Sequence, residues 1–244
     1  MGNSLRIDPR TLPQLFAWYA ADSVAGLGAA LPADAAQIGQ WNDLSGNARH
    51  LVQGTGANQP IFKVGVAGLN GVFPALRFNG TTQSMPVAVA TVPARPWTIV
   101  GVMKNSLADD NLAHHAISFN NDRVTIDMDW TTNNKLAWVD DATLVNAGPA
   151  GDSTLWHIVT LMAEPVGPFS RFTVDGTLFT KAGLAGTNTN SNIQVGQASA
   201  AFWSGDIAEV MIFTGDFQPC VLDAIRQALA EKYGLLASQT LAGQ

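Results

Sequence analysis

The feature that most restricts the fold of this chain is a long series of short apolar or alternating segments, each ended by turn-forming residues. Residues 123–130 are typical, because their apolar and polar members alternate as in a half-buried strand, and the apolar set is Val124, Ile126, Met128 and Trp130. Asn, Asp, Gly and Thr fill the short intervals between such segments, as hairpins require. About a dozen short strands at this spacing predict two antiparallel sheets packed face to face.

The predicted strands are followed by a single predicted helix. We expect strands over residues 15–21, 60–64, 75–79, 97–104, 116–120, 123–130, 135–140, 156–163, 170–175, 192–197 and 207–213. The segment 97–104 is almost entirely apolar, which indicates a strand buried on both faces. The helix begins at Pro219, which suits the first helical position, and ends before Gly234; its apolar stripe is Leu222, Ile225 and Leu229. We expect this helix to cross one end of the sandwich.

Four sequence blocks resemble a known superfamily in their order and content. They are residues 15–22, residues 40–50 with Trp-Asn-Asp-Leu-Ser-Gly-Asn, residues 74–80 (Pro-Ala-Leu-Arg-Phe-Asn-Gly) and residues 205–213. The pattern is similar to the concanavalin A-like lectin/glucanase superfamily, in particular its laminin G-like branch in bacterial surface proteins and bacteriophage structural proteins. The resemblance covers residues 8–235 and implies an all-β, two-sheet antiparallel jelly-roll sandwich with one C-terminal α-helix. We therefore predict one such domain over residues 1–244, with its core over residues 13–235.

Charge and cysteine content argue against several classes of protein. The net charge of −6 argues against a nucleic-acid binder, and the one cysteine, Cys220, cannot form an internal disulfide. The chain starts without the apolar region of a signal peptide and has no run that could span a membrane, so we expect a soluble protein made in a cytoplasm, which the resemblance implies is bacterial. Only 13% of residues are charged, against about 25% in typical soluble domains. Such a surface either contacts other chains or is a plain uncharged β surface, and both interpretations stay open.

The acidic residues do not form the motif of the superfamily's glycosidases. Those enzymes, by resemblance, would place paired carboxylates on one strand in a Glu-x-Asp-x-x-Glu type pattern. This chain has three glutamates far apart in sequence, Glu164, Glu209 and Glu231. Asp127 and Asp129 share one strand face, but a solvated outer face is the simpler interpretation. Neither a Gly-x-Ser-x-Gly elbow nor a nucleotide-binding loop is present. We therefore expect no enzymatic activity.

Calcium, which members of the superfamily often carry, has one candidate site. Asp43, Ser45 and Asn47 alternate as oxygen-bearing residues in a turn, and a hard cation can use such oxygens. The spacing is not that of an EF-hand, and a hydrogen-bonded Asx turn explains the same residues equally well. Asp206 and Glu209 have the same two interpretations. A calcium ion at the turn is therefore one hypothesis, and a purely structural turn is the other.

Sugar binding needs an exposed aromatic ring that stacks on a pyranose face, with polar side chains beside it, and seven tryptophans are enough to supply one. The first candidate group lies in and near a predicted turn and consists of Trp130, Asn133, Asn134 and Trp138. The second group is Asn190 with Trp203. The other tryptophans lie in apolar blocks and are interpreted as core residues: Trp18, Trp41, Trp97 and Trp156. For any single tryptophan, a core position is the more common one.

Two functions from different classes follow. The resemblance and the charge-poor surface favour a non-enzymatic virion protein that decorates a capsid or forms a fibre. Its partners would be other virion proteins, further copies of itself and host or surface glycans, but neither nucleic acid nor a membrane. The alternative is a free carbohydrate-binding module or degraded glycanase that depends on calcium. Self-association or firm attachment to another protein would support the first, whereas a monomer with measurable sugar affinity would support the second.

Overall fold

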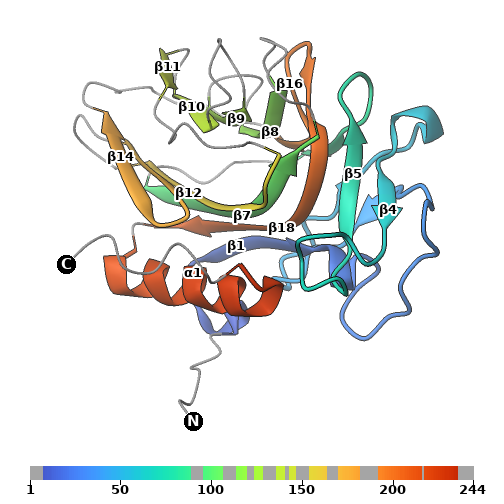
Figure 1. Cartoon of the computed structure of the whole chain (residues 1–244), viewed down its shortest axis with the longest axis horizontal. Helices are drawn as coiled ribbons and strands as arrows, with labels where there is room; N and C mark the ends of the chain where they lie inside the picture. The colour runs from blue at the N-terminus through green and yellow to red at the C-terminus, as the bar shows by residue number, and fades with distance from the viewer. Residues whose placement is uncertain are drawn as a thin grey trace.

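Two antiparallel sheets face each other, and one helix lies on the outside of the larger sheet (Figure 1). The computed structural model describes residues 8–88, 96–106, 114–119, 124–128, 136–140, 143–146, 154–163, 170–181, 192–215 and 217–235. Every strand pairing in these residues is antiparallel. The predicted fold class, an all-β sandwich with one C-terminal helix, is confirmed.

The larger sheet has eight strands in the order β14–β13–β12–β7–β18–β5–β4, and β1 also pairs with β18. Because β7 runs along one edge of β18, the strands β1 and β5 share the opposite edge. The bounds are β1 (Leu15–Ala20), β4 (Ile61–Lys63), β5 (Ala75–Asn79), β7 (Trp97–Asn105), β12 (His157–Ala163), β13 (Ser170–Val174), β14 (Thr177–Lys181) and β18 (Ser204–Thr214).

The smaller sheet has six strands in the order β11–β10–β9–β8–β15–β6. Their bounds are β6 (Met85–Ala88), β8 (His114–Phe119), β9 (Val124–Met128), β10 (Leu136–Asp140), β11 (Thr143–Asn146) and β15 (Asn192–Val195). Two short two-stranded pairs and three 3₁₀ turns complete the described elements: β2 (Gln40–Trp41) with β3 (Leu51–Val52), β16 (Gln197–Ala198) with β17 (Ala201–Phe202), η1 (Pro9–Thr11), η2 (Ala21–Ser23) and η3 (Gly56–Asn58).

An inner core fills the space between the two sheets. Ile99 and Ile212 of the larger sheet and Ile117 of the smaller sheet belong to this one buried cluster. The rings of Trp97 and Phe119 meet edge to face at a centroid distance of 5.1 Å, which joins the two sheets directly. One of the two side-chain sets of β7 and one of β18 thus lie in the inner core.

An outer core lies between the larger sheet and α1 (Pro219–Tyr233). Val100 of β7 and Met211 of β18 point to this side, where they pack with the helical stripe of Leu222, Ile225 and Leu229. Both faces of β7 are therefore covered, which confirms the prediction from its continuous apolar sequence. Burying each large apolar side chain contributes about 1.5–3 kcal/mol, so the stripe holds the helix on the sheet.

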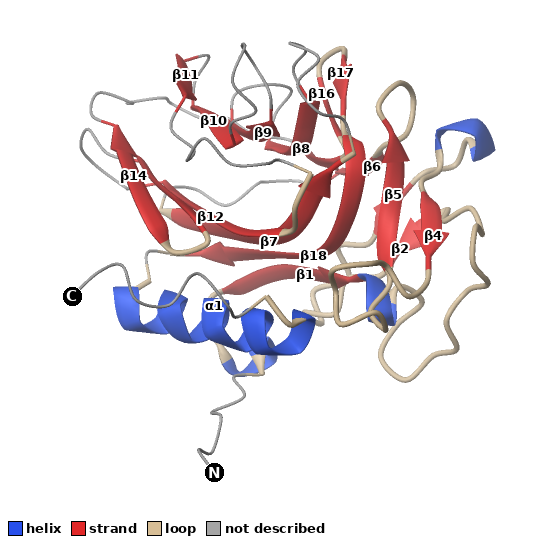
Figure 2. Cartoon of the chain, viewed as in Figure 1, coloured by secondary structure: helices blue, strands red, loops and turns tan. Residues whose placement is uncertain are grey.

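The ends of α1 agree with the sequence prediction, but its position does not. Pro219 is the first helical residue, and Gly234 caps the C-terminus with a left-handed φ of 72°. The helix does not cross one end of the sandwich, as expected; it runs along the outer face of the larger sheet (Figure 2). Among the described residues, no helix has the length and apolar character needed to cross a membrane.

Candidate ligand-binding site

The turn after β2 is held together by the carboxylate of Asp43. Its Oδ1 accepts hydrogen bonds from the backbone nitrogens of Trp18 at 3.0 Å and Ser45 at 2.9 Å. Its Oδ2 accepts from the Ser45 hydroxyl at 2.8 Å and from the backbone nitrogen of Arg49 at 3.0 Å. The carboxylate of this buried residue therefore faces four donors, as in a hydrogen-bonded Asx turn.

Asn47 and Arg49 tie the same turn to β1. The Asn47 side-chain nitrogen donates to the carbonyl oxygens of Leu15 and Phe16 at 3.1 Å each, and Arg49 donates to the Phe16 carbonyl at 2.7 Å. Among the described residues, no group of three or more His, Cys, Asp or Glu is arranged to hold a metal ion. The geometry of Asp43, Ser45 and Asn47 is that of a hydrogen-bonded structural turn, and calcium at this turn stays a hypothesis.

A pocket of about 400 Å³ lies on the outer face of the larger sheet, between η1, β1, β18 and α1. Its apolar lining includes two aromatic rings and consists of Pro9, Trp18, Phe73, Met211, Ile225, Ala228 and Leu229. Its charged lining consists of Asp8, Arg10, Glu209, Glu231 and Lys232. Small-molecule sites are typically about 300–1,000 Å³, mainly apolar, with a few placed polar groups. The pocket fits that description.

The centre of the pocket is organised by Glu209, a carboxylate that is 2% exposed. Its Oε1 accepts a hydrogen bond from the indole nitrogen of Trp18 at 2.7 Å. Its Oε2 accepts from the Lys232 ammonium at 2.7 Å and from the Tyr233 hydroxyl at 2.6 Å. These bonds fix the indole of β1 and the end of α1 to the same carboxylate on β18, so the pocket wall is preorganised.

One ammonium group faces two carboxylates at this end of α1. Lys232 also lies 2.9 Å from the Asp22 carboxylate. Burial alone would lower the pKa of Lys232, but the Glu209 and Asp22 carboxylates outweigh it and raise that pKa above its ordinary value. Burial, with the nearby Glu209 charge, raises the pKa of Tyr233 well above its ordinary value. The lysine stays protonated and the phenol stays neutral at physiological pH, so both remain hydrogen-bond donors.

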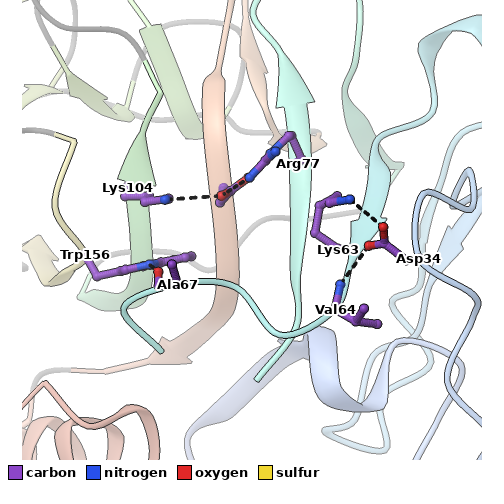
Figure 3. A network of polar contacts seen from close by, with 8 residues as sticks. Asp34, Lys63, Val64, Ala67, Arg77, Lys104 and Trp156 are labelled. Carbon is purple, nitrogen blue, oxygen red and sulfur yellow. Dashed lines mark hydrogen bonds and ion pairs between the residues drawn. The ribbon is translucent and has the colours of Figure 1, made fainter. Parts of the chain in front are cut away.

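A second polar network crosses the same sheet face (Figure 3). Asp206 on β18 is fully buried and receives two hydrogen bonds from Arg77 on β5, at 2.7 and 2.9 Å. Lys104 on β7 lies 3.7 Å from the same carboxylate and 5.4 Å from the ring centre of Trp156. Trp156 in turn donates to the carbonyl of Ala67 at 3.0 Å. This network joins neighbouring strands and holds the segment after β4 against the sheet.

The predicted sugar-binding residues are not brought together in the described part of the chain. Trp203 is fully buried, which corrects its assignment, because a ring without an exposed face cannot stack on a sugar. Trp138 lies in β10, and its side chain is outside the description. The other candidates lie outside the described residues: Trp130, Asn133, Asn134 and Asn190. Trp18, interpreted from the sequence as a core residue, instead lines the pocket while only partly buried.

No family model matches the chain, and no curated protein matches its sequence. Several solved structures share its fold. Domain 4 of an extracellular arabinanase from Geobacillus stearothermophilus, in complex with arabinotriose, is 12% identical with a TM-score of 0.57, over 90% of this chain and 98% of that domain. An arabinofuranosidase bound to arabinofuranosyl-α-1,2-xylobiose is 13% identical, TM-score 0.61, over 81% of this chain and 51% of that one. A Trypanosoma rangeli sialidase in complex with sialic acid is 10% identical with a TM-score of 0.57, over 90% of this chain and 33% of the sialidase.

These likenesses correct the expected function. The matched structures are glycoside hydrolases and one domain of such an enzyme, and none of the three is a virion protein. The expectation of a non-enzymatic virion decoration or fibre protein is therefore wrong. At these identities the likenesses show the fold alone, and the chain spans only about half of the arabinofuranosidase and a third of the sialidase.

Proposed function

We propose that this chain is a glycan-binding domain and that its ligand site is the pocket between η1, β1, β18 and α1. The observation that carries the proposal is the Trp18 indole, which lines this pocket and is held in place by Glu209. A fixed aromatic ring presents an apolar face to the C–H groups of a sugar, and its orientation is set before the ligand arrives. Charged side chains around it, among them Asp8 and Arg10, provide partners for sugar hydroxyl groups.

The solved structures support a first choice of ligand. The arabinanase domain that aligns over 98% of its length is in complex with arabinotriose, and the arabinofuranosidase is bound to an arabinofuranosyl-xylobiose. Arabinose-containing oligosaccharides are therefore the first ligands we propose for this pocket. We also propose that the sandwich is a jelly roll of the concanavalin A-like, laminin G-like kind, on the four sequence blocks that lie in and around β1, β2, β5 and β18.

The test is a titration of the purified chain with arabinotriose by calorimetry, followed by a panel of other oligosaccharides. The Trp18→Ala variant is expected to bind at least about tenfold more weakly, which corresponds to about 1.4 kcal/mol, because the stacking face is lost. Trp18→Phe keeps a ring but not the indole nitrogen that donates to Glu209, so we expect an intermediate affinity.

Controls separate loss of binding from loss of folding. Each variant is melted beside the parent protein, and Leu31→Ala, at a side chain that is 46% exposed and outside the pocket, serves as the matched surface change. Leu31→Ala is expected to bind as the parent does. If the parent binds none of the oligosaccharides, or if Trp18→Ala binds them unchanged, the proposal fails.

Glycoside hydrolysis at the same pocket is a second candidate, favoured by one observation. The fold brings Glu209 and Glu231, which the sequence separates, into the lining of a single pocket together with Asp8. Glycosidases place a pair of carboxyl groups on either side of the bond they cleave. Incubation with arabino-oligosaccharides and with an aryl arabinofuranoside, followed by product analysis, tests this. If cleavage occurs, Glu231→Gln and Glu209→Gln are each expected to lower the rate by about 10²-fold or more, since general acid–base groups contribute about 10²–10⁴-fold.

A further inference from the structure

A groove lies on the other flank of α1 from the Trp18 pocket. It consists of two adjoining cavities of about 170 and 200 Å³, which share the residues Gly176, Asp223 and Arg226. The sheet side is formed by β12, β13 and β14, on the far side of β7 from β18 and β1. The helix residues that line the groove differ from those that line the pocket. The groove and the pocket are therefore separate places on the molecule.

Two threonines in the groove carry hydroxyl groups without a hydrogen-bond partner among the described residues. Thr160 of β12 and Thr173 of β13 are directly opposite each other in the strand pairing, and both line the 170 Å³ cavity. Thr160 is 1% exposed, and neither hydroxyl has a hydrogen-bond partner within the part of the chain that the structure describes. A buried polar group without a partner costs about 1–3 kcal/mol. Two such groups side by side in one cavity indicate partners that come from outside the chain.

The rest of the cavity is matched to a neutral ligand. Met162, Leu178 and Leu222 supply apolar walls. Arg226 forms an ion pair with Asp223 in the same lining, so these two charges compensate each other. The third charged residue of the lining, Arg171, is not without a partner either, so the cavity is not built around a free cation that would select an anion. A volume of about 170 Å³ is roughly that of five or six water molecules at about 30 Å³ each. This is the size of a compact ring with a few substituents.

We propose that this groove is a second binding site, which takes a single neutral polyhydroxylated ring such as a monosaccharide. One ligand hydroxyl would accept a hydrogen bond from a threonine hydroxyl and donate to the other, while the C–H face of the ring packs on Leu178 and Met162. The site is distinct from the Trp18 pocket and does not depend on the function proposed there.

The experiment uses L-arabinose, D-galactose and D-glucose as probes, with binding followed by saturation-transfer NMR and titration. The double variant Thr160→Val/Thr173→Val is expected to bind at least tenfold more weakly than the parent. Because it removes two unsatisfied hydroxyl groups while nearly keeping the side-chain shape, it is also expected to melt at the same temperature as the ligand-free parent or higher. Thr173→Ser, which keeps a hydroxyl, is expected to retain binding, and so is Trp18→Ala, whose change lies on the other flank of α1.

A second variant tests the site without changing Thr160 and Thr173. Leu178 is 55% exposed and lines the cavity, so Leu178→Trp fills the groove from the solvent side and is expected to abolish binding. The proposal is overturned if the parent binds none of the monosaccharides, or if the Thr160→Val/Thr173→Val and Leu178→Trp proteins bind them as the parent does. Loss of monosaccharide binding in Trp18→Ala, but not in these variants, also overturns it and assigns that binding to the Trp18 pocket.

Discussion

Above about pH 10, where free tyrosines ionise, the protein is expected to unfold in one cooperative step, and both of its tyrosines are expected to ionise in that step. The chain has two tyrosines, Tyr19 and Tyr233, and both are almost completely inaccessible to solvent. Burial raises the pKa of each phenol, and a neighbouring carboxylate, Asp43 or Glu209 respectively, raises it further. Neither phenol can lose its proton at its ordinary pH while the protein stays folded.

The sign of the effect follows from proton binding. A free tyrosine ionises near pH 10, so between that pH and the higher pKa of the folded state the native protein binds more protons than the unfolded chain. The free energy of unfolding therefore falls as the pH rises through this range, by about 1.4 kcal/mol per pH unit for each tyrosine. Lys232, whose pKa is also raised, adds a fall in the same direction. Against a total stability of about 5–15 kcal/mol, the two tyrosines alone remove about 4 kcal/mol over one and a half pH units.

The measurement is phenolate absorbance recorded together with circular dichroism along a pH titration. The two curves are expected to coincide, whereas in concentrated guanidinium chloride both tyrosines should titrate near pH 10. Tyr233→Phe retains one buried phenol. The part of the pH dependence of its free energy of unfolding that comes from tyrosine ionisation is therefore expected to be about half as steep as in the parent. Ionisation of both tyrosines near pH 10 with an unchanged dichroism spectrum would contradict the prediction.

The parts of the fold that local pattern controls could be predicted from the sequence. The apolar run of β7 and the helical stripe with Pro219 and Gly234 at its ends are both present as expected. The short strands β3, β6 and β14 were missed. In β6, Pro86 argues against a strand, and β3 has two residues, too few for any alternation to be visible. The position of α1 was also missed, because a stripe shows that a helix is buried but not against which surface.

The candidate site was less predictable, because its main contact joins Trp18 to Glu209 across 191 residues of sequence. From the sequence, Trp18 was interpreted as a core residue, and Glu209 as a structural residue or a calcium ligand. One local signal was available: a glutamate inside the otherwise apolar run of β18 must be buried, and a buried carboxylate needs donors. Trp18, Lys232 and Tyr233 are those donors. The sequence can therefore say that Glu209 has partners, but only the fold says which.

Replacing Arg77 with methionine is expected to lower the free energy of unfolding by about 3 kcal/mol. Asp206 is fully buried, and Arg77 is the partner that forms two short hydrogen bonds to it, whereas Lys104 is 3.7 Å away. Breaking a buried ion pair by removing one partner typically costs about 3–5 kcal/mol, because a buried charge is left uncompensated. We place the value at the lower end, since the Arg77 side chain is 44% exposed and water can reach the vacated space.

A chemically matched change on the neighbouring strand provides the control. Lys63 on β4 forms a 2.7 Å ion pair with Asp34, but the two side chains are 26% and 46% exposed, so water screens the pair and Lys63→Met is expected to leave the free energy of unfolding nearly unchanged. The double variant Arg77→Met/Asp206→Leu removes the buried charge together with its partner and is expected to be more stable than Arg77→Met alone. Chemical denaturation of the parent protein and the three variants measures the change in the free energy of unfolding for each variant. If Arg77→Met costs no more than Lys63→Met, the buried carboxylate does not depend on its arginine, and the network in Figure 3 contributes little to the stability of the sheet.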